Sequence, residues 1–190
     1  MRAVLKLLVV ALLIACSAAA AQAGDAPIAV LDFELNDLTL DPNNPAERER
    51  TASIKAMLEE ALVARHYRLV AVDPVAQSVA DEGVGYLFDH PDAAGALGRA
   101  AGADWVIVGR VHKASFLFVY LKAHVVNAKT GEQAADLVVE VKGPQKALTR
   151  RGVETLADQI KAALENPEIT FNSSRDTRSS ISAACCSGTG

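Results

Sequence analysis

The stretch that most constrains the fold is residues 102–131, which reads GADWVIVGRVHKASFLFVYLKAHVVNAKTG. A Gly-Ala-Asp turn precedes residues 105–111, which are apolar on both faces, as expected of a strand in the middle of a sheet. The next run alternates, with Leu117, Val119, Leu121, Ala123 and Val125 on one side and Phe116, Phe118, Tyr120, Lys122 and His124 on the other. A turn at residues 127–131 leads into a third run, residues 134–141. The pattern predicts three consecutive strands. It contains no group of residues typical of a catalytic site.

The remaining periodic segments predict two more strands and several helices. Strands are predicted over residues 28–35 and 67–72, and helices from Ala46 onward, over residues 75–80, 93–101 and 149–164. The order β-α-β-α-β-β-β-α predicts an α/β (α+β) fold, with a single mixed β-sheet of about five strands and helices packed on it. We expect one such domain over residues 24–166, followed by a disordered polar tail at residues 167–190.

The first 23 residues have the pattern of an export signal. Arg2 and Lys6 precede an apolar segment, residues 7–15, and Ala21-Gln22-Ala23 is a small-x-small cleavage pattern. We expect cleavage after Ala23 and a periplasmic location. The alternative is a membrane-anchored lipoprotein acylated at Cys16, because Leu13-Ile14-Ala15-Cys16 resembles a lipobox.

Charge and cysteine content exclude several classes of protein. Without Arg2 and Lys6, the 19 basic residues fall to 17 against 23 acidic residues, so the net charge goes from −4 to −6. An acidic chain with no dense basic and aromatic patch is a poor nucleic-acid binder, and we expect no nucleic-acid partner. Outside the leader only the adjacent Cys185 and Cys186 remain, in the polar tail, so no framework of disulfides is expected.

Several of these segments together resemble a known family. Residues 28–34 and 102–109, Val111-His112-Lys113-Ala114-Ser115 and Lys129-Thr130-Gly131 are similar to a family of exported bacterial proteins of uncharacterised function. That family is in turn similar to the α/β module at the N-terminus of TolB and in CsgG-type secretion lipoproteins. Many of its members carry a cysteine pair before the helix that precedes Gly102, where this chain has FDHPD at residues 88–92. The resemblance implies a periplasmic module without established catalysis and supplies no active-site residues.

One group of residues suggests a small-ligand or metal site. Asp89, His90 and Asp92 lie close together in sequence, and His112 follows a central strand. Imidazole and carboxylate groups are common metal ligands, but the histidines lack a zinc-type spacing. The simpler interpretation is that Asp89 or His90 caps the next helix. We find no catalytic motif, and we expect a protein that is not an enzyme and needs no cofactor.

The aromatic stripe of the second run predicts a protein-binding surface. Phe116, Phe118, Tyr120 and Lys122 would share one face of the hairpin. Counting back from the turn pairs Lys122 with Asp136 and Phe118 with Glu140, unless a bulge shifts the register. The alternative is that the final helix or residues 51–65 cover this face. We therefore expect a non-catalytic module that binds an envelope protein partner, with a periplasmic ligand-binding protein as the alternative.

Overall fold

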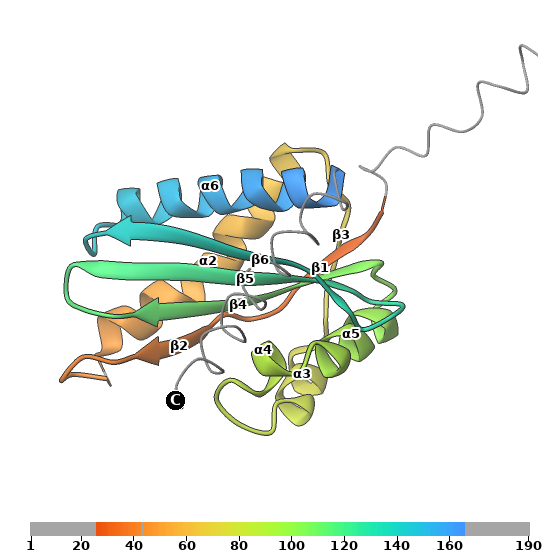
Figure 1. The fold of residues 1–190 in the computed structure, drawn as a ribbon, viewed down its shortest axis with the longest axis horizontal. Helices are drawn as coiled ribbons and strands as arrows, with labels where there is room; N and C mark the ends of the chain where they lie inside the picture. The colour runs from red at the N-terminus through yellow and green to blue at the C-terminus, as the bar shows by residue number, and fades with distance from the viewer. Residues whose placement is uncertain (1–25, 43, 166–190) are drawn as a thin grey trace, which may run out of the picture.

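A computed structural model of the chain describes residues 26–42 and 44–165, and every structural statement below concerns these residues. The expected export signal, Cys16, the cleavage point after Ala23 and the tail cysteines lie outside them. The described part holds one six-stranded mixed sheet with helices packed on it, which confirms the predicted fold class (Figure 1).

The sheet has the order β3-β1-β4-β5-β6, and β2 also pairs with β4. Its strands are β1 (Ile28–Val30), β2 (Glu34–Asp37), β3 (Leu69–Val70), β4 (Trp105–Lys113), β5 (Phe118–Asn127) and β6 (Gln133–Lys142). The pairings of β1 with β3 and β4, and of β2 with β4, are parallel. The strands β4, β5 and β6 form an antiparallel meander. The predicted three consecutive strands are thus the centre and one edge of the sheet.

The helices are α2 (Pro45–Ala64), α3 (Pro74–Ala80), α4 (Tyr86–Asp89), α5 (Pro91–Ala100) and α6 (Lys146–Glu165). Local sequence sets where three of them begin. Proline occupies the first turn of α2, α3 and α5, where its missing N–H costs nothing. Asn44 and Asp73 cap α2 and α3 by accepting hydrogen bonds from the amides of Ala46 and Val75.

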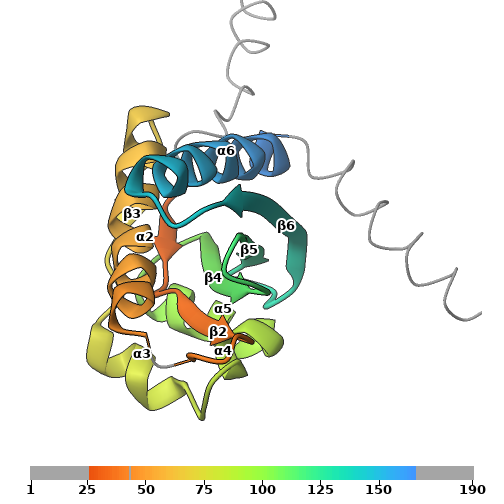
Figure 2. The ribbon, with the colours of Figure 1, turned by 90° about the vertical axis from the view of Figure 1, so that its left-hand side faces the viewer.

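Two apolar clusters lie on opposite faces of the sheet. The helices α2 and α6 cover one face, where Ile54, Leu58, Leu156 and Ile160 pack against β-strand residues such as Leu121. The helices α3, α4 and α5 gather under one end of the other face, as Figures 1 and 2 show. The rest of this second face, toward the loop between β4 and β5, has no helix under it (Figure 1).

The predicted first strand, residues 28–35, is interrupted. The amide of Leu31 still donates to the carbonyl of Ile107, but Leu31, Asp32 and Phe33 lie between β1 and β2 without strand pairing. Phe33 is buried, and its ring occupies the space that a side chain at position 109 would fill. Gly109 in β4 thus makes room for the ring. The predicted second strand is also shorter, since only Leu69 and Val70 of residues 67–72 pair.

The predicted register of the β5–β6 hairpin is wrong by two residues. Phe118 lies opposite Lys142 rather than Glu140, and Lys122 opposite Val138 rather than Asp136. One residue of this difference comes from a shift between Val125 and Val126, where β6 contains an additional residue, and the other comes from the turn, which closes between Asn127 and Glu132. Counting from the turn cannot detect such a bulge, although the faces of β5 from residue 119 onward are as predicted.

Candidate interaction surface

The helices α3, α4 and α5 cover only part of the second face of the sheet. Phe88 of α4 lies at the boundary of the covered part. The Phe88 ring lies 3.8 Å from the His124 ring, between centroids, and the Arg110 guanidinium carbon lies 4.1 Å from the Phe88 centroid. Beyond these contacts the face consists of side chains that are half-buried or exposed. We call this part the open face; it comprises His112, Phe118, Tyr120, Lys122, Val138 and Glu140.

The open face brings together three of the four residues predicted to bind a partner. Tyr120 and Lys122 are half-buried on β5, and Phe118 at the start of β5 is 38% exposed. Val138 lies opposite Lys122 on β6 and is 46% exposed. The predicted alternative, that α6 or residues 51–65 cover the aromatic stripe, is wrong because both elements pack on the other face.

Phe116 lies beside the open face, in the loop between β4 and β5, rather than on a strand. Phe116 and Leu117 are 65% and 66% exposed, so Leu117 does not point into the core as the alternation predicted. The hydroxyl of Ser115 accepts hydrogen bonds from the amides of Leu117 and Phe118, which turns the chain here and ends the strand alternation. The loop therefore presents two large apolar side chains to solvent.

A buried charge network holds this loop in place. The Lys113 side chain is 4% exposed, and its Nζ lies 3.0 Å from Oδ2 of Asp37, whose side chain is 1% exposed. Oε1 of Glu47 lies 3.7 Å from the same Nζ, so the network joins β4, β2 and α2. The Phe116 ring centroid lies 5.5 Å from Nζ of Lys113, at the edge of cation–π range.

Asp37 is the more deeply buried of the two acids in this network. Burial alone would raise the pKa of its carboxyl, but hydrogen bonds from Thr39 and Lys113 and the charge of Lys113 hold that pKa below its ordinary value. Thr39 donates from both its amide, at 2.9 Å, and its hydroxyl, at 2.7 Å. Sequence reasoning missed this network. The signal was Lys113 itself, which follows Ile107 and Val111 on the buried side of β4 and so requires a carboxylate partner.

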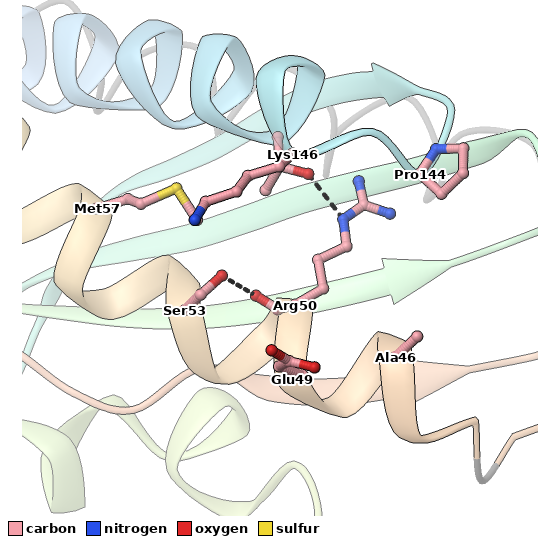
Figure 3. A pocket seen from close by; sticks show the side chains of 8 residues that line it. Ala46, Glu49, Arg50, Ser53, Met57, Pro144 and Lys146 are labelled. Carbon is pink, nitrogen blue, oxygen red and sulfur yellow. Dashed lines mark hydrogen bonds between the residues drawn. The ribbon is translucent and has the colours of Figure 1, made fainter.

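A second network links α2 to α6 behind the same loop. Nε of Arg50 donates to the hydroxyl of Thr149 at 2.8 Å, and Nη2 donates to the carbonyl of Gly143 at 3.4 Å. A pocket of about 200 Å³ opens beside it, with Arg50 and Ser53 on the α2 side and Lys146 reaching across from α6 toward Met57 (Figure 3). The Arg50 guanidinium is thus engaged within the protein.

The predicted ligand residues do not converge. Asp89 lies 3.4 Å from Nη2 of Arg110, and His90 stacks on Tyr86 with Nδ1 2.9 Å from the Tyr86 carbonyl. Asp92 is in the first turn of α5. Within residues 26–42 and 44–165, no three His, Cys, Asp or Glu side chains are grouped so that they could hold a metal ion.

The predicted capping by Asp89 or His90 is also wrong in its detail. His90 occupies the N-cap position of α5, but its side chain makes no capping hydrogen bond, since the ring is turned back onto Tyr86. Asp89 is instead an ion-pair partner of Arg110, next to Glu34, which also pairs with Arg110. Sequence reasoning did not anticipate this cluster, whose members come from β2, β4 and α4.

His112 lies on the open face, away from α4. Its Nδ1 is 3.5 Å from Nδ2 of Asn36, and its ring centroid lies 6.3 Å from that of Tyr120. Burial, with the positive charges of Lys122 and Arg110, lowers the pKa of His112 below its ordinary value. The ring is therefore neutral near pH 7 and can present a hydrogen-bonding nitrogen beside Tyr120.

Sequence comparison with known families gives one match. A family model named DUF3280, described as "Protein of unknown function (DUF2380)", matches residues 26–160. No curated protein matches the chain. Among the helices of the described part, none has both the length and the apolar character needed to cross a membrane.

Solved structures of similar fold come from several bacteria. The hypothetical protein CT253 from Chlamydia trachomatis is 10% identical, with a TM-score of 0.50 over 73% of this chain and 98% of that one. Lipoprotein GNA1162 from Neisseria meningitidis is 17% identical, with a TM-score of 0.46 over 72% and 99%. The LpoB C-terminal domain from Salmonella enterica is 17% identical, with a TM-score of 0.44 over 68% and 90%. At these identities the likeness concerns the fold alone.

Proposed function

The chain belongs to the DUF3280 family of proteins of unknown function, and we propose that it is a non-catalytic protein-interaction module of the cell envelope. The observation that carries this proposal is the open face with its adjoining loop. There Phe116, Leu117, Phe118 and Val138 expose apolar surface beside Tyr120 and Lys122. The related similarity to the TolB and CsgG-type modules remains a prediction.

The composition of this surface supports a protein as the partner. Aromatic side chains supply large contact area with little loss of conformational freedom, and Tyr adds a hydroxyl for hydrogen bonding. The border carries both signs of charge, with Lys122 and Lys142 on one hand and Glu140 on the other. An apolar centre with a charged rim is the usual anatomy of a protein-binding site. The envelope as the location rests on the predicted export signal.

A rigid backbone supports the surface. Phe118, Tyr120 and Lys122 stand on a strand paired on both sides, and the loop before it is fixed by Ser115 and by the Gly143 amide, which donates to the Leu117 carbonyl at 2.9 Å. The buried Lys113–Asp37 pair anchors the end of β4 below the loop. A partner would therefore meet a largely preformed surface, which lowers the entropic cost of binding.

The ligand-binding alternative has no such support. Its predicted residues Asp89, His90, Asp92 and His112 are engaged with different neighbours or separate from one another. None of them lines the pocket beside Arg50 or a second pocket of about 450 Å³ between Phe33 and α2. No geometry in the described residues favours this function.

Site-specific photo-crosslinking in intact cells tests the proposal. A photoreactive phenylalanine analogue replaces Phe118, and in a matched control it replaces Val79, which is 79% exposed on α3. We expect a discrete crosslinked envelope protein from position 118 and none from position 79. Phe118→Asp, folded as judged by circular dichroism, should abolish affinity capture of that protein by the chain without the crosslinker. Equal crosslinking from both positions, or none from position 118, would contradict the proposal.

A further inference from the structure

The strand β6 is an edge of the sheet, and its outer side is unpaired within the described residues. It has 10 residues, Gln133–Lys142, and pairs only with β5. Figure 2 shows it at the margin of the sheet, beside α6. An edge strand of this length, without proline, offers a row of free backbone donors and acceptors to another strand.

The hydrogen-bond pattern identifies which backbone groups face outward. The amide of Gly143 donates to the carbonyl of Leu117, so this pair is a hydrogen-bonded one in the β5–β6 ladder. Hydrogen-bonded and non-bonded pairs alternate along an antiparallel ladder, so Val141, Val139 and Leu137 also bond inward to β5. The N–H and C=O groups that point away from β5 therefore belong to Asp136, Val138, Glu140 and Lys142.

The side chains of these four residues are exposed and alternate in a particular order. Along the strand they are negative, apolar, negative and positive, while Leu137, Val139 and Val141 between them are buried under α6. Any strand that pairs with this edge must therefore place its own side chains against that pattern on the open face.

We propose that the partner of this edge is β6 of a second copy of the chain, paired antiparallel about a two-fold axis at Val139. Asp136 then lies opposite Lys142 of the second copy, and Val138 lies opposite Glu140 of the second copy. Symmetry repeats both pairs, so two ion pairs close the two ends of the interface. This is a self-complementary interface of the kind that closed two-fold dimers require.

Charge selects this register among those that the backbone allows. Outward residues must pair with outward residues, so the copies can slide only in steps that keep even-numbered residues opposite one another. One step in one direction places Asp136 opposite Glu140, and one step in the other places Glu140 opposite itself. Both arrangements bring like charges together, which is destabilising. The register centred on Val139 pairs all four residues without a like-charge contact.

The side chains at the two ends of the interface also have contacts within their own copy, and Nζ of Lys142 lies 5.8 Å from the Phe118 ring centroid. Lys142 Nζ lies 3.3 Å from Oε1 of Glu140, and Asp136 Oδ1 lies 3.5 Å from Nε2 of His124. The side chains of Lys142 and Asp136 are 73% and 54% exposed, so both can turn toward a second copy. Dimerisation would also join the two open faces into one surface, because an axis perpendicular to the sheet keeps them on the same side.

Sedimentation equilibrium of the mature exported protein tests the proposal, because it measures the average molar mass as a function of protein concentration. We expect a monomer–dimer equilibrium, weakened about tenfold or more by Lys142→Glu, which sets like charges opposite each other at both ends. The double variant Asp136→Lys with Lys142→Glu should restore the wild-type dimer. The control Lys161→Glu, the same charge change on the exposed side of α6, should leave it unchanged.

A backbone variant separates edge pairing from other modes of association. Glu140→Pro removes an outward N–H and leaves the inward ladder of β6 intact, a position where edge strands accept proline. It should abolish the dimer while circular dichroism and thermal unfolding stay close to wild type. A protein that is monomeric at all concentrations would overturn the proposal. So would a dimer that neither Lys142→Glu nor Glu140→Pro weakens. Either result leaves the photo-crosslinking test at Phe118 unaffected.

Discussion

Nζ of Lys113 lies 3.0 Å from Oδ2 of Asp37, and both side chains are almost completely buried below the exposed Phe116 loop. The pair joins two strands whose residues are 76 positions apart in sequence. An ion pair withdrawn from water is stable only if its members keep their partners, because an unpaired buried charge is costly. The loop that carries part of the proposed binding surface thus depends on a contact that no partner touches.

Removing one member of this pair should destabilise the protein strongly. We expect Lys113→Met to lower the free energy of unfolding by about 3 to 5 kcal/mol, since Asp37 is left buried without its cation. Arg150→Met is the control, because Arg150 and Glu60 form an exposed pair at 3.1 Å that should contribute less than about 1 kcal/mol. Urea unfolding measures both. Equal losses of unfolding free energy in the two variants would show that the buried pair stabilises the protein no more than the exposed pair does.

Stability should fall at acid pH through Asp37. The folded state holds the pKa of this carboxyl below the ordinary value of 3.8, so the unfolded chain binds its proton more readily. The stabilisation is present above the unfolded pKa and is lost as pH falls from that value through the lower folded one. Asp37→Asn should flatten this acid limb in urea unfolding measured as a function of pH. An unchanged slope in the variant would assign the limb to other carboxyls.

His112 should titrate below the value of a free histidine. Burial, Lys122 and Arg110 all lower its pKa from 6.5, so its contribution to stability is present above pH 6.5 and is lost as pH falls through the folded value. Lys122→Gln should raise the midpoint of His112 in an NMR titration, because one repelling charge is gone. Lys129→Gln, which changes a lysine that pairs with Asp104 instead, serves as the control. A midpoint that does not respond to Lys122→Gln would contradict the assigned geometry.

The fit between Phe33 and Gly109 should be intolerant of added atoms. Gly109→Ala places a methyl group where the Phe33 ring lies, and overpacking of this kind costs about 1 to 3 kcal/mol. Phe33→Leu in the same chain should recover part of the loss, which thermal unfolding of the single and double variants would detect. Purely additive losses for Gly109→Ala and Phe33→Leu would mean that the two sites do not interact.

The sequence predicted secondary structure best where the type and faces of an element follow from the residues of that element alone. The apolar run at residues 105–111 and the alternation of β5 from residue 119 onward predicted their elements and faces correctly. Proline and the apolar stripes located the starts of α2, α3 and α5 to within about two residues. These signals are local, and the tertiary structure did not override them.

Most of the features that sequence reasoning missed depend on residues that the chain alone does not relate. The break after Val30 reflects the fit of Phe33 against Gly109, which no pattern within residues 28–35 encodes. The register of Phe118 depends on an extra residue in β6, and the burial of Lys113 depends on Asp37. Phe118 and Tyr120 are accessible because α3, α4 and α5 cover only the other end of this face of the sheet. A single sequence gives no account of that placement.

The two edges of β4 pair with strands that lie at very different distances from it in the sequence. On one side the short turns of the β4–β5–β6 meander join strands that are close in sequence, while β1 and β2 reach the other side from far away in the chain. Closing a long loop costs more entropy than closing a short one, so we expect the meander to assemble first and the N-terminal strands to dock onto it. Until they do, β4, whose residues are mostly apolar, has an unpaired edge. A truncated chain that lacks residues 28–37 would therefore be prone to aggregation.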